Sequence, residues 1–202
     1  MFSVLAVGRV CNVVEIRIHI TIAIMELLMS KNIYLPITFK IPTFEDFRGC
    51  LSVPYDQSLG LDFQVKQINQ GYSKKAFTLR GLHYQAGDAA QAKLVSCLRG
   101  SIFSVAVDLR SGDTRGQTYS EVLSWENRKM MYVPRGFAHG YLTLEDDTLM
   151  QWCVDNDFCA EAARAVRYDD PDMIWNGENW PKGDYIMSDK DRNAMSLKDI
   201  CM

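Results

Sequence analysis

The sequence predicts an all-β protein whose strands form an antiparallel sandwich or barrel. Short segments that alternate between apolar and polar residues recur about every 8–12 residues through the middle of the chain, with turn residues between them. The same region lacks the longer periodicity of amphipathic helices. The 202 residues are 48% apolar and 23% charged, which suits one globular domain with its own core.

The clearest strand covers residues 101–109, where Phe103 and Val107 lie on one face and small or polar side chains lie on the other. This alternation is the pattern of a half-buried strand. Residues 93–98 precede it, and Gly100 marks a turn between the two segments. We therefore expect the two segments to pair as a β-hairpin.

Further strands follow at residues 117–124, 130–133, 140–144 and 148–154. The C-terminal part of the chain has a different character. Residues 169–171 and 180–183 contain proline, and we expect them to form loops packed over the barrel. Residues 188–200 are expected to hold a short helix.

Residues 1–28 are apolar, but Arg17 and Glu26 interrupt them, so no run reaches the ~18–20 apolar residues that a membrane span needs. We interpret this segment as an N-terminal extension of unknown role and residues 29–202 as the functional domain. A chain that starts at Met29 is expected to keep its fold and its chemistry. We predict no membrane association.

The net charge of −3 argues against a nucleic-acid-binding protein that depends on overall positive charge. An anionic ligand would instead need locally concentrated positive charge. None of the six cysteines forms a C-x-x-C pair, and the three histidines show no zinc-finger spacing. We expect reduced thiols and a cytoplasmic protein.

Residues suited to acid–base chemistry or anion binding gather in four segments, at 78–85, 91–93, 134–140 and 188–191. Arg80 and His83 have an odd separation, which would place them on opposite faces of an unbent strand. A bulge at Gly81 would turn both toward one cavity. From spacing alone, the histidines are also consistent with core residues, the cations with surface charges and Asp191 with a helix cap.

A series of motifs runs from about residue 44 to residue 194: D-x-R-G at 46–49, Q-x-N at 67–69, LRGLHYQ at 79–85, QAKLV at 91–95, FSVAVDLR at 103–110, VPRGFAHGY at 133–141, RYDDP at 167–171 and S-x-K-D at 188–191. Each motif is weak alone, but their order and spacing together are specific. The chain resembles the dTDP-4-dehydrorhamnose 3,5-epimerase family of nucleotide-sugar epimerases. The resemblance implies an antiparallel jelly-roll (cupin-like) barrel with short peripheral helices, and a homodimer that exchanges strands.

The resemblance also implies a substrate, a 4-keto-6-deoxyhexose attached to a nucleoside diphosphate. Its ketone acidifies the hydrogens on C3 and C5, so a base can remove one, an enolate forms, and a proton returns on the opposite face. By resemblance His83 is the base, Asp191 orients it, and Lys93 stabilises the enolate oxygen. Neither a cofactor nor a metal is implied. The implied substrate-binding residues are Arg48, Gln67, Asn69, Arg80, His139 and Lys190.

One position departs from the family pattern. A family tyrosine that returns the proton is replaced here by Trp152, whose indole N–H donates hydrogen bonds but is a poor general acid. Trp152 is expected to line the sugar pocket, or to belong to the barrel core.

Three explanations of this departure stay open. The chain is an epimerase for a different sugar or a single carbon, or a slower 3,5-epimerase with another proton donor, or a nucleotide-sugar-binding relative with altered catalysis. Retention of His83, Lys93 and Asp191 favours the first two. A metal-dependent cupin enzyme is a further alternative, but it needs clustered ligands such as His-x-His, and Gln85 stands where a second histidine would be.

Overall fold

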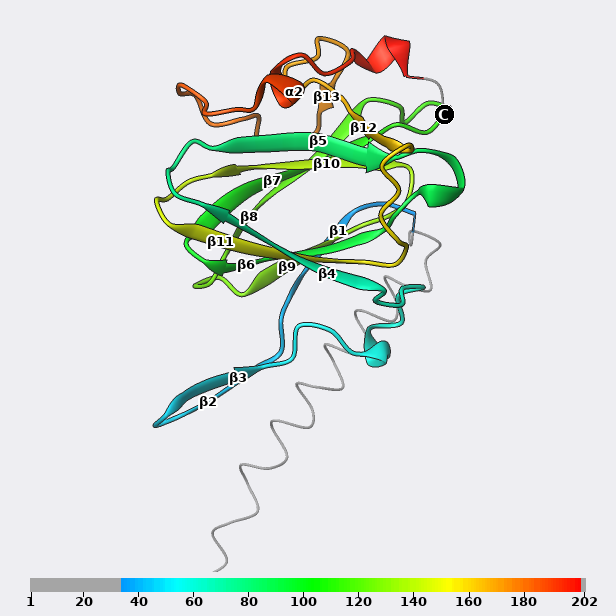
Figure 1. Cartoon of the computed structure of the whole chain (residues 1–202). Helices are drawn as coiled ribbons and strands as arrows, with labels where there is room; N and C mark the ends of the chain where they lie inside the picture. The colour runs from blue at the N-terminus through cyan, green and yellow to red at the C-terminus, as the bar shows by residue number, and fades with distance from the viewer. Residues whose placement is uncertain (1–33, 201–202) are drawn as a thin grey trace, which may run out of the picture. The chain divides into compact units, whose positions relative to one another are not determined.

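Two sheets that face each other form the main unit of the protein (Figure 1). The structure is a computed structural model, and it describes residues 34–200, so the predicted extension at 1–28 lies outside the described residues. The first sheet has the order β1 (Ile37–Lys40), β9 (Lys129–Val133), β6 (Lys93–Arg99), β11 (Thr148–Val154) and β4 (Gln67–Ser73). The second has the order β12 (Ala163–Ala165), β5 (Leu79–Gln85), β10 (Phe137–Thr143), β7 (Ser101–Asp108), β8 (Gln117–Ser124) and β13 (Ile174–Trp175).

Neighbouring strands in both sheets are antiparallel, except for the short parallel pair of β8 and β13. The chain is thus an antiparallel jelly roll, as predicted. The strands expected at 117–124, 130–133, 140–144 and 148–154 are present as β8 to β11, within a few residues of the predicted ends.

The predicted hairpin between residues 93–98 and 101–109 is wrong. Both segments are strands, but β6 pairs with β9 and β11, whereas β7 pairs with β8 and β10 in the other sheet. The chain crosses between the sheets at Gly100, which has a φ of +74°. A hairpin and a crossover between two sheets share the same local sequence pattern, two strands on either side of a turn. Only the packing of each strand against distant strands distinguishes the two arrangements.

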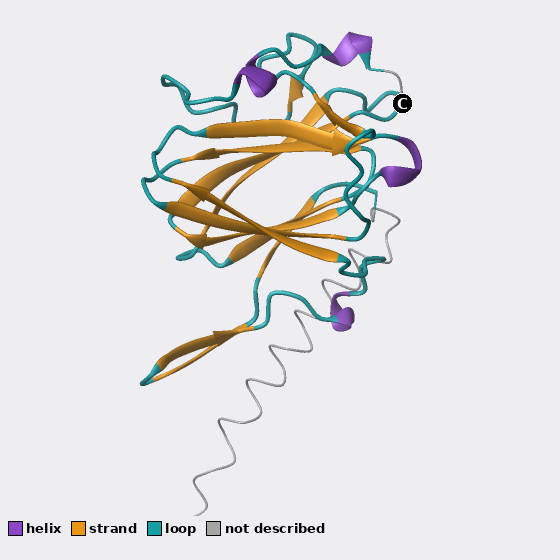
Figure 2. Ribbon diagram, viewed as in Figure 1, coloured by secondary structure: helices purple, strands orange, loops and turns teal. Residues whose placement is uncertain are grey.

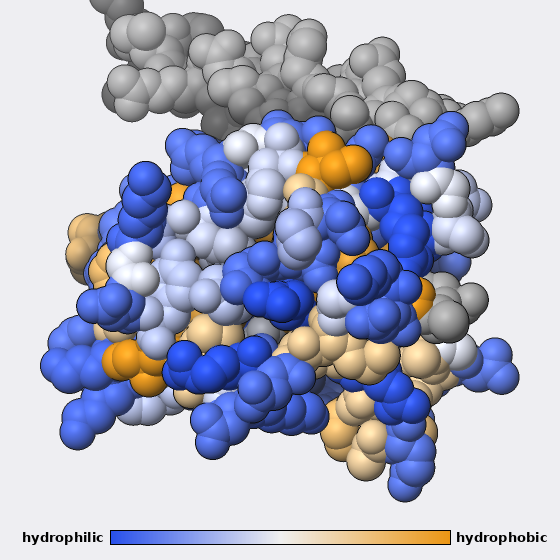
Figure 3. All heavy atoms as spheres, turned by 90° about the horizontal axis from the view of Figure 1, so that it is seen from above, coloured by the Kyte–Doolittle hydropathy of each residue, from blue (hydrophilic) through white to orange (hydrophobic). Residues whose placement is uncertain are grey.

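Strand β7 is buried on both faces, so it is not the half-buried strand that its alternation predicted. One face packs between the sheets, with Ile102 beside Met131 and Phe137. The other face, which includes Phe103, packs under C-terminal loops that bring Trp180 against it. The predicted packing of these loops over the barrel is confirmed. The surface seen from their side is mostly hydrophilic (Figure 3).

A β-hairpin lies between β1 and β4 in the chain and was not predicted from the sequence. It consists of β2 (Thr43–Asp46) and β3 (Gly49–Ser52), which among the described strands pair only with each other. Its apolar side chains are exposed, with Phe47 97% and Leu51 67% accessible. Such a hairpin leaves apolar surface available for a partner.

Within residues 34–200, helical structure is limited to single turns (Figure 2). The predicted C-terminal helix appears as α2 (Asp189–Arg192) and a 3₁₀ turn (Leu197–Asp199), and another 3₁₀ turn covers Gly87–Ala89. Residues 55–62 belong to a separate compact unit with a 3₁₀ turn at Gln57–Leu59. Across residues 34–200, no helix has the length and apolar character to cross a membrane.

Candidate active site

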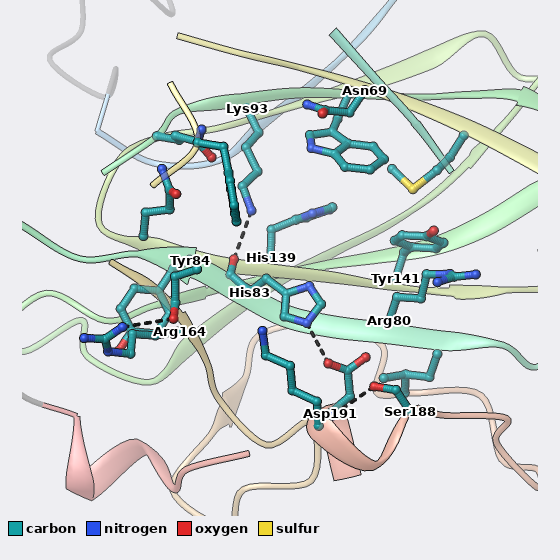
Figure 4. A pocket seen from close by; sticks show the side chains of 18 of the residues that line it. Asn69, Arg80, His83, Tyr84, Lys93, His139, Tyr141, Arg164, Ser188 and Asp191 are labelled. Atoms are coloured by element: carbon teal, nitrogen blue, oxygen red, sulfur yellow. Dashed lines mark hydrogen bonds and ion pairs between the residues drawn. The ribbon is translucent and has the colours of Figure 1, made fainter. Parts of the chain in front are cut away.

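A cavity of about 660 Å³ is lined by both sheets and by the C-terminal segment (Figure 4). Strands β4, β6 and β11 contribute from one side, and β5 and β10 from the other. The cavity brings together nine of the ten residues predicted for the site, which are Gln67, Asn69, Arg80, His83, Lys93, His139, Trp152, Lys190 and Asp191.

His83 and Asp191 form a hydrogen-bonded pair in this cavity. His83 Nε2 lies 2.6 Å from Asp191 Oδ1, and the imidazole is partly open to the cavity while Asp191 is only 5% exposed. Burial acts to raise the pKa of Asp191, but the hydrogen bond and charge of His83 and the Gly81 N–H outweigh it, and the pKa is lowered. The carboxylate is therefore ionised at neutral pH and accepts the hydrogen bond.

The predicted bulge in β5 is present at Gly81. His83 lies opposite His139, whereas Arg80 lies opposite Tyr141, so β5 has one more residue than β10 over this stretch. Gly81 has a φ of +122°, and a Cβ there would come within 2.6 Å of the Gly140 Cα. Only glycine permits this approach, and the bulge turns both Arg80 and His83 toward the cavity.

Lys93 is a buried cation at the start of β6. Its Nζ donates a hydrogen bond to the main-chain oxygen of His83 at 2.9 Å, and the residue is 8% exposed. Burial disfavours the ammonium form and lowers the pKa of Lys93 from 10.5 to about 8. The side chain is thus still mostly charged at neutral pH, in a site with little water to screen that charge.

His139 lies directly across from His83 but has a different environment. It is 6% exposed, and its Nε2 shares a hydrogen bond of 2.9 Å with Ser104 Oγ. Burial lowers the pKa of His139 well below 6.5, and the neighbouring Lys93 and His83 add to the effect. His139 is therefore neutral at pH 7, which suits a wall residue that donates or accepts hydrogen bonds.

Apart from Lys93 on β6, the five-stranded sheet forms the opposite wall with uncharged side chains. Gln67 Nε2 donates to Asn69 Oδ1 at 2.5 Å on β4, and Trp152 pairs with Asn69 across β11 and β4. Trp152 is half-buried and lines the cavity, as expected for a residue that contacts a sugar.

Arg48 is the one predicted residue that the described chain does not bring to the cavity. It lies beside the turn of the β2–β3 hairpin, where its guanidinium forms an ion pair with Asp46 at 2.6 Å. Within one chain Arg48 therefore lies outside the cavity.

Sequence reasoning gave no site role to Arg164, Phe158 or Ser188, which also line the cavity. The Ser188 hydroxyl accepts the Asp191 N–H at 3.1 Å and so caps α2. The S-x-x-D spacing at 188–191 is a signal for this cap. No comparable local signal marks Arg164 and Phe158, because only the fold brings β12 and the segment after β11 to this cavity.

The balance of charge at the cavity is positive, although the whole chain is acidic. Among its lining residues are four cations, Arg80, Lys93, Arg164 and Lys190, against one carboxylate, Asp191. This local excess is what an anionic ligand requires in a protein of net charge −3. Within residues 34–200, no three His, Cys, Asp or Glu side chains form a group that could hold a metal ion.

Comparisons with known proteins agree with the fold and identify the family. The family model described as dTDP-4-dehydrorhamnose 3,5-epimerase matches residues 32–199. A dTDP-4-dehydrorhamnose 3,5-epimerase of Sinorhizobium fredii is 43% identical over 141 residues, covering 69% of this chain and 71% of the relative.

Solved structures give the same result. The crystal structure of dTDP-4-dehydrorhamnose 3,5-epimerase from Elizabethkingia anophelis is 40% identical, with a TM-score of 0.73 and coverage of 81% of this chain and 92% of the relative. A dTDP-6-deoxy-D-glucose-3,5-epimerase from Legionella pneumophila, solved with dTDP-4-keto-L-rhamnose, is 32% identical with a TM-score of 0.75, and the match covers 82% and 89% of the two chains. The chain therefore belongs to the dTDP-4-dehydrorhamnose 3,5-epimerase family.

Proposed function

We propose that the protein is an isomerase that epimerises a nucleoside-diphosphate 4-keto-6-deoxyhexose at C3, C5 or both, in deoxysugar biosynthesis. The observation that carries this proposal is the His83–Asp191 pair at 2.6 Å, next to the buried cation Lys93 in one cavity. A base, its orienting carboxylate and a cation are the three groups that enolisation of a ketone needs.

His83 is the base in this proposal. Because the ionised Asp191 accepts the hydrogen bond, His83 Nε2 carries a proton and Nδ1 keeps its lone pair. Nδ1 takes the hydrogen from the carbon beside the ketone, and the electrons of that C–H bond move to the carbonyl oxygen. Asp191 stabilises the imidazolium that results.

Lys93 provides positive charge for the enolate oxygen. Its ammonium is held in place by the His83 main-chain oxygen and is shielded from water, so it needs no rearrangement when negative charge develops. A preorganised charge in a site of low polarity is more effective than the same charge in solvent.

The remaining lining residues suit the rest of the substrate. Arg80, Arg164 and Lys190 offer cationic groups for the diphosphate. Asn69 and Gln67 offer amides for hydrogen bonds to the sugar or nucleotide, with His139 and Trp152 as further walls near the sugar.

We further propose a homodimer in which the β2–β3 hairpin packs on the partner subunit. The exposed Phe47 and Leu51 support this, because isolated apolar hairpins are unstable in water. In such a dimer Arg48 would reach the substrate of the partner subunit. A cytoplasmic location is proposed as well, supported by the free thiols of Cys50, Cys97, Cys153 and Cys159.

Nuclear magnetic resonance in D₂O tests the proposed function. The protein is mixed with dTDP-4-keto-6-deoxyglucose, and deuterium at C3 and C5 is followed together with the configuration of each carbon. We expect the wild type to introduce deuterium and to invert at least one of the two carbons. His83→Asn should abolish the exchange, since the amide that replaces the imidazole cannot act as a base.

Asp191→Asn should slow the exchange by about 10²-fold or more, because the amide cannot stabilise the imidazolium. Asp199→Asn is the matched control, since this exposed carboxylate in the same segment accepts a hydrogen bond from the Ser196 hydroxyl and lies outside the cavity, so the rate should be unchanged. Exchange that survives in His83→Asn would remove His83 from the mechanism.

A further inference from the structure

Inversion of a carbon requires a proton donor on the face opposite the base. This inference rests on the proposed function, in which His83 acts from strand β5 of the six-stranded sheet. The opposite wall belongs to the five-stranded sheet, where Asn69, Trp152 and Lys93 line the cavity. The amide and the indole are not useful acids, and the Lys93 ammonium is hydrogen-bonded to the main-chain oxygen of His83, on the side of the base. The proton must therefore come from another group.

Tyr141 reaches this opposite wall from strand β10. Tyr141 follows His139 by two residues in β10, so the two side chains lie on the same face of the strand. The Tyr141 ring extends across the cavity toward β4 of the other sheet. The Tyr141 hydroxyl lies 3.0 Å from the point where a Cβ of Gly71 would stand, and Trp152 Cζ3 lies 3.4 Å from that point. Gly71 thus leaves the space that the hydroxyl occupies, next to the edge of the indole.

The Tyr141 hydroxyl is buried without a hydrogen-bond partner. The residue is 6% exposed, and no atom in the part of the chain that the structure describes bonds to its oxygen. Ser73 is a neighbour, but its hydroxyl does not meet hydrogen-bond geometry with the phenol. Buried polar groups are nearly always satisfied, and the exceptions are often functional.

The environment keeps this phenol protonated. Burial raises the pKa of Tyr141, and the positive charge of Arg80 acts in the opposite direction. A group with a raised pKa still holds its proton at neutral pH, and the nearby guanidinium stabilises the phenolate once the proton has left. Figure 4 shows Tyr141 and Arg80 side by side at one end of the cavity.

We propose that Tyr141 is the proton donor that completes inversion on the face opposite His83. The enolate carbon forms a new C–H bond with the phenol hydrogen, the carbonyl is restored, and Tyr141 is left as a phenolate. Solvent then returns a proton to Tyr141 and removes one from the His83 imidazolium, so no other reactant is needed. The substrate reaches the hydroxyl by displacing the neighbouring edge of Trp152.

Tyr141→Phe is the decisive variant, because it removes only an oxygen that has no bonding partner. We expect its melting temperature to equal or exceed that of the wild type. In D₂O it should retain exchange on the His83 face, while the rate of inversion falls by about 10²-fold or more. Tyr119→Phe is the control, since Tyr119 lies outside this cavity and should leave both rates unchanged.

Trp152→Phe separates this proposal from a role of the indole N–H. It should keep the wild-type ratio of inversion to exchange, even where binding weakens. Wild-type inversion by Tyr141→Phe would overturn the proposal and leave the proposed function intact. A wild-type protein that neither exchanges nor inverts would overturn both, and a Trp152→Phe variant that exchanges without inverting would assign the donor to Trp152 instead.

Discussion

Replacing Lys93 by methionine should make the protein more stable and much less active. The fall in the pKa of Lys93 from 10.5 to about 8 means that burying the ammonium costs about 3 kcal/mol at pH 7. Lys93→Met keeps a similar volume without the charge, so this cost disappears. The hydrogen bond from Lys93 to the His83 oxygen is lost as well, which costs about 1.5 kcal/mol.

The net effect is a gain of about 1–2 kcal/mol in the free energy of unfolding. For a domain of this size the melting temperature should rise by about 2–8 °C. Removal of the cation from the developing enolate should lower kcat by about 10²–10³-fold. Calorimetry and the D₂O exchange assay measure the two effects, with Lys40→Met on the exposed side of β1 as the control that should change neither.

The pH dependence gives a second check on the same reasoning. In the folded wild type Lys93 loses its proton above about pH 8, whereas in the unfolded chain it holds it up to about 10.5. The wild type should therefore gain stability between these values, and the advantage of Lys93→Met should shrink over the same window. A variant that melts at or below the wild type at pH 7, or an advantage that is constant with pH, would refute the argument.

Three further predictions concern the pH profile, the bulge and the hairpin. The epimerisation rate should fall as pH rises through about 8, because Lys93 becomes neutral there, and Lys93→Met should lose this alkaline limb. Gly81→Ala should destabilise the fold by about 2–4 kcal/mol, since it combines backbone strain with a Cβ 2.6 Å from the Gly140 Cα. Gly112 has a similar φ of +126°, but no atom lies within 4 Å of the position of an added Cβ, so Gly112→Ala should lose only the stability that backbone strain costs. Equal losses of stability in the two variants, measured by thermal unfolding, would contradict a steric clash at Gly81. Phe47→Asp should shift the mass measured by light scattering from dimer to monomer, and an unchanged mass would count against packing of the hairpin on a partner.

The sequence predicted the elements of this fold better than their partners. Strands β8 to β11 follow from alternation and turn residues, which are local properties. The pairing partners of β6 and β7 do not follow from local properties, because the residues around Gly100 do not indicate which distant strands will pair with each of the two. The short hairpin strands β2 and β3 were missed because four residues are too few for a periodic signal.

The candidate site shows the same division. The bulge at Gly81 was predictable because Arg80 and His83 have an odd separation and can face one cavity only if the strand is bulged between them. The approach of Asp191 to His83 was available only through the family resemblance, since the two are far apart in the chain. Tyr141 could not be evaluated from the sequence, because its significance depends on the space over Gly71 and on an unsatisfied hydroxyl.

The separation of the His83–Asp191 pair also bears on how the protein is made. The two residues are 108 positions apart, and Asp191 lies in the last turn of α-helix before the C-terminal residues. A chain emerging from the ribosome can build most of both sheets while it still lacks the carboxylate. Since its strands pair mainly over long sequence distances, closure of the barrel is expected to be slow. The ability to deprotonate a sugar should therefore appear only at the end of synthesis, when the segment that carries Asp191, Leu197 and Ile200 packs on the barrel.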